Sequence, residues 1–106
     1  MFKRFDHIGV PHKMEREGEV WIDGMKLWLI NPDETPFRYE YLRFREDTWF
    51  AEEVQTQTHI AVEVDKIADV LPLCEKILHE KIVVNENLTI AFVIHDGVLL
   101  ELMEYK

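Results

Sequence analysis

The sequence predicts an α+β domain made of two related modules of the βαβββ type, the first of which lacks its helix. Three observations support this fold class. A β-type run with a histidine opens each half, a strand with a central glutamate closes each half, and an apolar helical pattern occurs in the second half alone. We expect module 1 over 1–44, a connector over 45–57 and module 2 over 58–106, with the strands forming a curled mixed sheet around a cleft.

The repeat is visible at both ends of each half. Residues 6–10 read DHIGV and residues 58–62 read THIAV, so His7 and His59 occupy equivalent places. Each half then closes with a strand that has a central glutamate: Glu40 in 37–44 and Glu101 in 98–105. Matches at both ends of two half-chains indicate an internal repeat.

The halves differ in length where a helix is expected. His7 and Glu40 are 33 positions apart, whereas His59 and Glu101 are 42 apart. The longer half carries apolar residues at helical spacing, namely Ile67, Val70, Leu71, Cys74, Ile77 and Leu78. Residues 11–18 of the first half are polar and predict a loop instead.

Several residues around this helix have expected roles. Asp65 is a candidate N-cap, and Pro72 predicts a kink or a restart because it removes a backbone hydrogen bond. His79 is expected near the helix end, where it can interact with the helix dipole. Cys74 falls on the apolar face and is expected to pack in the core rather than act as a nucleophile.

The remaining elements follow from alternation and turn residues. The dipeptide Asp23-Gly24 predicts a two-residue hairpin between two strands. The expected strands are 19–22, 25–30, 82–84 and 88–94, with turns at 31–36, 85–87 and 95–97 and a short helical turn within 47–53.

Composition excludes several classes of partner. The 21 acidic and 12 basic side chains give a net charge of −9, which argues against unaided binding to nucleic acid or to an anionic membrane. No apolar run approaches the roughly 20 residues that span a bilayer. The single cysteine, Cys74, precludes an intrachain disulfide and suits a reducing cytoplasm.

Glu101 is difficult to explain as scaffold. It lies among Val98, Leu99, Leu100, Leu102 and Met103, so apolar side chains occur on both sides of its strand. Both faces are therefore expected to be covered, and a buried carboxylate needs a partner.

His59 and His7 raise the same question. His59 shares one face of its strand with Ala61 and Glu63, while the opposite face is apolar and suited to receive the helix. We expect two histidines and two glutamates to converge on the face away from the helix.

Two imidazoles and two carboxylates suit a divalent ion such as zinc, nickel, cobalt, manganese or ferrous iron, because the carboxylates balance its charge. The alternatives are ordinary ones. A strand histidine can be a hydrogen-bonded core residue, and Glu40 can form an ion pair with Arg38 or Arg43.

Other candidates carry weaker signals. His12 could line a pocket mouth or lie on the surface, and His95 is expected in a turn. Trp21, Trp28 and Trp49 could line an apolar pocket, although core or dimer contacts are the alternative.

The paired pattern resembles the vicinal oxygen chelate superfamily, which includes glyoxalase I, methylmalonyl-CoA epimerase, extradiol dioxygenases and bleomycin-resistance proteins. The matching segments are 6–10, 58–65 (THIAVEVD) and 97–102 (GVLLEL). The resemblance covers nearly the whole chain and is most specific after residue 57. The departure is the missing first helix.

The resemblance implies a fold and a chemistry. By position, His7, Glu40, His59 and Glu101 match the four metal ligands of the glyoxalase and epimerase members. The implied activity is a glyoxalase-type lyase or isomerase that transfers a proton on a small substrate with two neighbouring chelating oxygens. Glu101 or Glu40 would be the base.

Alternatives to this activity remain. One is a metal-free, bleomycin-resistance-like protein that binds a small molecule, and another is a structural dimer module with a vestigial site. The missing helix leaves the sheet around Trp21 and Trp28 open, so we expect a homodimer, which is also common in the family.

Overall fold

The computed structural model describes all 106 residues and contains eight strands with little helix, which confirms the α+β class. The chain divides into two compact units. The N-terminal unit comprises His7–Thr58, and the C-terminal unit comprises Met1–Asp6 together with His59–Lys106. None of the helices has the length and apolar character required to cross a membrane.

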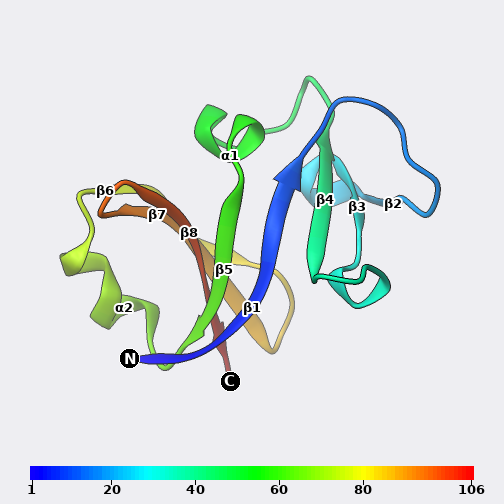
Figure 1. Cartoon of the computed structure of the whole chain (residues 1–106). Helices are drawn as coiled ribbons and strands as arrows, with labels where there is room; N and C mark the ends of the chain where they lie inside the picture. Colours follow the sequence, from blue (N-terminus) through cyan, green and yellow to red (C-terminus); the bar gives the residue numbers. More distant parts are fainter. The chain divides into compact units, whose positions relative to one another are not determined.

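The strands of the N-terminal unit follow the order β2-β3-β4-β1. Strand β1 is parallel to β4, while the other two pairs are antiparallel (Figure 1). The bounds are β1 (Phe2–Pro11, which begins in the C-terminal unit), β2 (Val20–Ile22), β3 (Leu27–Ile30) and β4 (Tyr39–Phe44), followed by α1 (Glu52–Thr56). No helix lies between β1 and β2, as predicted.

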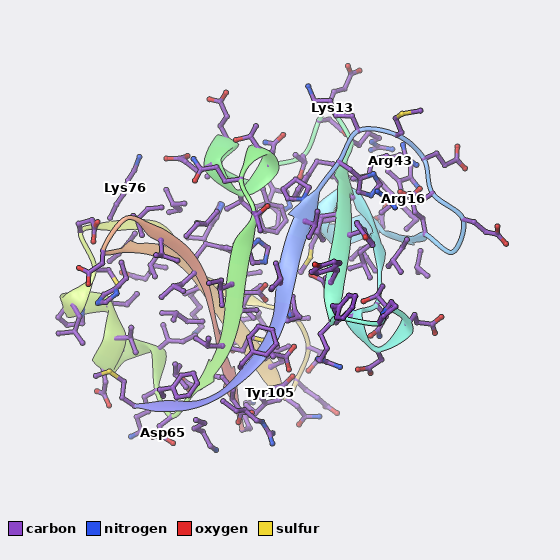
Figure 2. The ribbon with its side chains drawn as sticks, in the orientation of Figure 1. Lys13, Arg16, Arg43, Asp65, Lys76 and Tyr105 are labelled. Carbon is purple, nitrogen blue, oxygen red and sulfur yellow. The ribbon has the colours of Figure 1, made fainter.

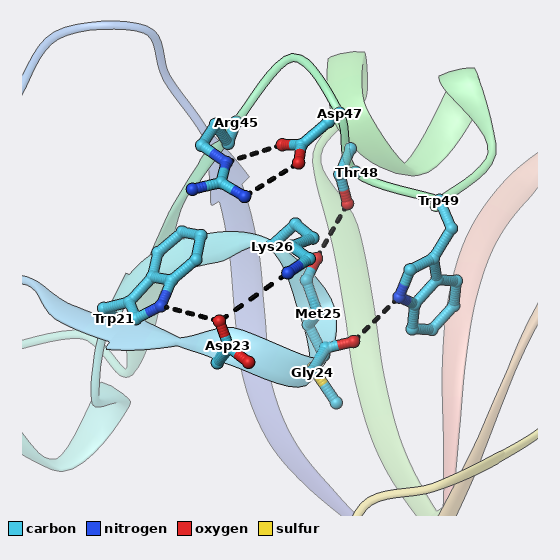
Figure 3. A network of polar contacts seen from close by, with 9 residues as sticks. All are labelled: Trp21, Asp23, Gly24, Met25, Lys26, Arg45, Asp47, Thr48 and Trp49. Carbon is cyan, nitrogen blue, oxygen red and sulfur yellow. Dashed lines mark hydrogen bonds and ion pairs between the residues drawn. The ribbon is translucent and has the colours of Figure 1, made fainter.

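Arginine side chains cover aromatic rings on the sheet of this unit. Arg43 lies 3.9 Å from the ring centre of Trp28, its Cα partner on the neighbouring strand. Arg45 lies over Trp21 at 4.7 Å (Figure 3). Arg16, which is labelled together with Arg43 in Figure 2, lies over Tyr41 at 4.0 Å. These cation–π contacts shield a sheet face that has no helix of its own.

The C-terminal unit has the predicted βαβββ order, with strands arranged β5-β8-β7-β6. Strand β5 is parallel to β8, and the other pairs are antiparallel. The bounds are β5 (His59–Val64), α2 (Ile67–Val70), the 3-10 turn η3 (Leu71–Leu73), β6 (Lys76–Val83), β7 (Leu88–His95) and β8 (Val98–Tyr105).

The helix is shorter than predicted. After α2 and η3 the chain enters β6 at Lys76, so Ile77, Leu78 and His79 lie in a strand and the expected contact of His79 with a helix dipole is wrong. The change to 3-10 geometry at Pro72 agrees with the expected kink. Pairing with β7 supplies the backbone hydrogen bonds that a longer helix would have made.

The N-cap prediction is also wrong. Lys66 occupies the N-cap position without a side-chain capping bond, and the carboxylate of Asp65 lies 2.8 Å from the amino group of Met1. Glu104 on β8 serves the helix instead, since its Oε1 accepts a hydrogen bond from the backbone N–H of Ile67 at 2.7 Å. A cap supplied from a distant strand leaves no local sequence signal.

Two local predictions in the N-terminal unit need correction. The hairpin after β2 is not a two-residue turn: Asp23–Met25 form a 3-10 turn (η1), and Lys26 adopts a left-handed conformation with φ 56°. The helical turn expected within 47–53 lies later, as α1. Thr48 Oγ1 donates to the carbonyl of Met25 and Trp49 Nε1 to that of Gly24, both at 2.8 Å (Figure 3). These bonds to η1 anchor the segment before α1.

The core of the C-terminal unit lies between α2 and its sheet. It contains Val64, Ile67, Val70, Ala91, Val93 and Leu102, with Val62, Leu71, Cys74 and Leu100 packed against it. The apolar face of β5 therefore receives the helix, as predicted. Cys74 is half-buried beside this core, and burial raises the pKa of its thiol, which favours the unreactive form.

The variant Leu102→Ala tests this packing. Leu102 is 1% exposed, so we expect the truncation to lower the free energy of unfolding by about 2–5 kcal/mol. Urea unfolding followed by fluorescence measures the change. The matched variant Leu73→Ala, at a side chain 54% exposed, should stay within about 0.5 kcal/mol of the parent. Equal losses in both variants would contradict the assigned core.

Candidate metal centre

A buried histidine–glutamate pair lies on the sheet of the C-terminal unit. Strand β5 pairs with β8 so that Ala61 is opposite Glu101, and His59 precedes Ala61 by two residues on the same face. The Nε2 atom of His59 lies 3.0 Å from Oε1 of Glu101. The two residues are 1% and 7% exposed, which agrees with the prediction that both faces of β8 are covered.

The N-terminal unit contains an equivalent pair. Strand β1 pairs with β4 so that Gly9 is opposite Glu40, and His7 again precedes the small residue by two positions. The Nε2 atom of His7 lies 3.3 Å from Oε1 of Glu40, with the side chains 4% and 18% exposed.

The arginines near Glu40 engage other carboxylates. Arg38 forms an ion pair with Asp33, and Arg43 forms one with Glu19. Arg43 lies three residues after Glu40 on β4, so the two side chains are on opposite faces of the sheet. These pairings favour His7 as the partner of Glu40 within its unit.

The two pairs are built in the same way. Each uses two parallel strands, a glutamate on the closing strand, a small residue opposite it and a histidine two positions earlier. The sequence repeat is thus matched by an equal strand register in both units.

The chemistry of these side chains fits a cation. Two neutral imidazoles and two carboxylates provide nitrogen and oxygen donors, and two ionised carboxylates balance a divalent charge. Each unit thus presents one histidine and one glutamate, residue types that could hold a metal ion: His7 and Glu40 in the N-terminal unit, His59 and Glu101 in the C-terminal unit.

Sequence reasoning missed Phe92 as a neighbour of the C-terminal pair. Phe92 lies opposite Glu101 in the β7–β8 register and is 3% exposed. Its ring meets that of His59 edge-on, at 5.1 Å between centroids and 87° between planes. Its position one strand beyond the glutamate was not readable without the register.

Glu63 lies on the same face of β5 and has cationic partners. Its side chain is 7% exposed, and its Oε1 accepts from Nε of Arg4 at 2.8 Å. Nζ of Lys3 lies 3.4 Å from the other oxygen. The N-terminal strand therefore satisfies this buried carboxylate without a metal ion.

Two further histidines are outside these pairs. His95 ends β7 at the predicted turn, where Glu75 accepts hydrogen bonds from the N–H groups of Asp96 and Gly97. The ring centroids of His12 and Tyr41 are 5.7 Å apart. Tyr41 directly follows Glu40 on β4, so its side chain is on the opposite face of the sheet. His12 is therefore on the sheet face opposite the metal-ligand candidates, and it does not line their site.

His12 instead borders a buried ion pair. Arg43 donates to both oxygens of Glu19, at 3.0 and 2.8 Å, which holds the pKa of that carboxyl below its usual value. Nε2 of His12 lies 3.7 Å from Glu19 Oε2. Burial lowers the pKa of His12, so the neutral ring is favoured.

Comparisons with known proteins add information on the fold. No family model and no curated protein matches the chain. A solved structure, a hypothetical protein of Bacillus halodurans C-125, is similar with a TM-score of 0.63 and 19% sequence identity. The match covers 97% of this chain and 94% of that one. The likeness concerns the fold alone.

The His12 environment generates a prediction about pH. Because the folded-state pKa of His12 is lowered, the unfolded chain binds more protons around and below pH 6.5, and stability should fall as the pH decreases through this range. In the variant His12→Gln, the free energy of unfolding should depend less strongly on pH over this range. Urea unfolding at pH 7.5 and 5.5 measures it for both proteins.

Glu19 titrates outside the pH range of that experiment. Its lowered pKa contributes stability that is lost at more acidic pH, below its ordinary value of 4.5. An unchanged difference between pH 7.5 and 5.5 in His12→Gln would refute the proposed role of His12.

Proposed function

We propose that this chain binds one divalent metal ion through His7, Glu40, His59 and Glu101, and that it is a vicinal oxygen chelate-type enzyme. The proposed activity is a proton-transfer lyase or isomerase reaction on a small oxygen-chelating substrate. The observation that carries the proposal is the equal register of the two histidine–glutamate pairs. Two independent strand pairings have no evident structural need for the same buried imidazole and carboxylate.

The residues of the chain have distinct proposed roles. The chemistry supplied by a bound divalent ion is Lewis-acid polarisation of substrate oxygens. His7 and His59 supply nitrogen donors, and their burial excludes water from the donor atoms. Glu40 is our choice for the proton-accepting group, because its side chain is 18% exposed and that of Glu101 is 9% exposed. Glu101 is then the more permanent ligand.

A metal-free binding protein is the second candidate. It is favoured by the 3.0 Å contact between His59 and Glu101, because a hydrogen bond at that distance satisfies a buried carboxylate without a cation. In that case the four polar side chains would orient a small molecule rather than an ion. Metal analysis separates the two candidates.

The assembly and the location of the protein remain proposals as well. We propose a homodimer, although the arginines over Trp21, Trp28 and Tyr41 reduce the need for a second copy to cover that face. The single cysteine remains compatible with a reducing cytoplasm.

Metal binding is the direct test. Protein without a histidine tag, dialysed against zinc, cobalt, nickel or manganese, should retain about one ion per chain by elemental analysis. The variants His59→Ala and Glu101→Gln should each weaken binding by at least about tenfold in calorimetry, since losing a ligand exceeds the loss of an outer-shell partner. His7→Ala and Glu40→Gln should do the same from the other unit.

Matched variants outside the site control for general effects. His95→Ala, at the end of β7, and Glu86→Gln, in the turn before β7, change the same residue types and should leave affinity unchanged. Retention of none of the four ions by the parent protein would sink the metal proposal and favour the metal-free candidate. Loss of binding in variants of only one unit would limit the site to that unit.

A further inference from the structure

We infer that His79 and Phe92 position the ring of His59, so that His79 is a positioning residue of the metal centre. The inference rests on the proposed function. It starts from His79, which the sequence predicted near the end of a helix and which the structure locates in β6.

A continuous row of residues crosses the sheet of the C-terminal unit. Ala61 is opposite Glu101, Glu101 is opposite Phe92, and Phe92 is opposite His79. Directly opposed residues in neighbouring strands have side chains on the same face of a sheet. His79 is therefore on the face of Glu101 and His59, and α2 covers the other face.

Irregular pairing of β6 creates this arrangement. Ile77 is opposite Val93, so regular antiparallel pairing would have set His79 opposite Ala91, which belongs to the core under α2. A register shift between Ile77 and His79 moves His79 opposite Phe92 instead, and a second shift follows before Ile82. Bulges interrupt the hydrogen-bond ladder and can redirect a side chain to the other face.

The rings of the three residues are in contact. His79 meets Phe92 at 6.1 Å between centroids and 78° between planes, and Phe92 meets His59 at 5.1 Å and 87°. Both contacts are edge-to-face, a favourable geometry for aromatic rings. The chain of rings thus runs from a half-buried residue to a fully buried metal-ligand candidate.

The contact chain restricts the orientation of His59. Nε2 of His59 lies 3.0 Å from Oε1 of Glu101, and the ring of His59 packs edge-on against Phe92. Phe92 thereby limits rotation of the His59 ring, and His79 supports Phe92 from the neighbouring strand. Outer partners that orient a ligand histidine commonly change metal affinity by about 10- to 100-fold when removed.

The experiment compares two replacements of His79 of similar bulk. His79→Phe keeps an aromatic ring against Phe92, whereas His79→Leu fills much of the space without one. We expect zinc affinity by calorimetry to fall about 10-fold or more in His79→Leu and to stay within about threefold of the parent in His79→Phe. The cobalt-substituted absorption spectrum should change in the leucine variant alone. His95→Ala is the control on the neighbouring strand.

Measurements without metal separate this inference from the proposed function. In the metal-free protein, the imidazole ¹H–¹⁵N correlations of His59 should shift or broaden in His79→Leu and remain close to the parent in His79→Phe. Urea unfolding verifies that both variants are folded. A parent protein that binds no metal but shows this ring effect would overturn the proposed function alone.

Equal His59 spectra in both variants would overturn the positioning role, whether or not metal binds. Equal losses of affinity in both variants would overturn it as well, because they would show that the ring contact is not what matters.

Discussion

The parallel pairing of the opening and closing strands determines which side chains each module brings together. In both units the register sets a glutamate opposite a small residue and beside a histidine two positions earlier. A shift of one residue in either strand would send one partner to the other face of the sheet. Burial of each histidine and the donor set proposed for the metal ion both depend on this register.

The two units differ in what covers the sheet face opposite the histidine–glutamate pair. In the C-terminal unit, α2 and η3 pack apolar side chains onto β5, β7 and β8, with Glu104 capping the helix from β8. In the N-terminal unit, guanidinium groups lie over Trp21, Trp28 and Tyr41. Arginine can do this because its stem and its planar group cover an aromatic ring while part of the group remains hydrated. A shortened module thereby keeps its sheet without a helix.

Local pattern predicted well where one element determines the structure. The alternation in β5 and β8 identified the helix-facing side and the buried position of Glu101. The local pattern gave wrong predictions where a residue distant in the sequence determines the structure. Ile77 and Leu78 continue an apolar helical spacing and so predicted helix, but their segment pairs with β7 as a strand. Asp65 looks like a cap, yet its carboxylate is taken by the amino group of Met1.

The sequence by itself determined the fold class, the repeat, the missing first helix and the four candidate ligands, because these depend on periodicity and residue type. Only the tertiary structure decided that each histidine meets its own glutamate, that His12 faces away from them and that His79 joins their face. The physical reason is register. Strand pairing and its bulges set which residues are opposite one another, and a β-strand carries no local signal for its partner.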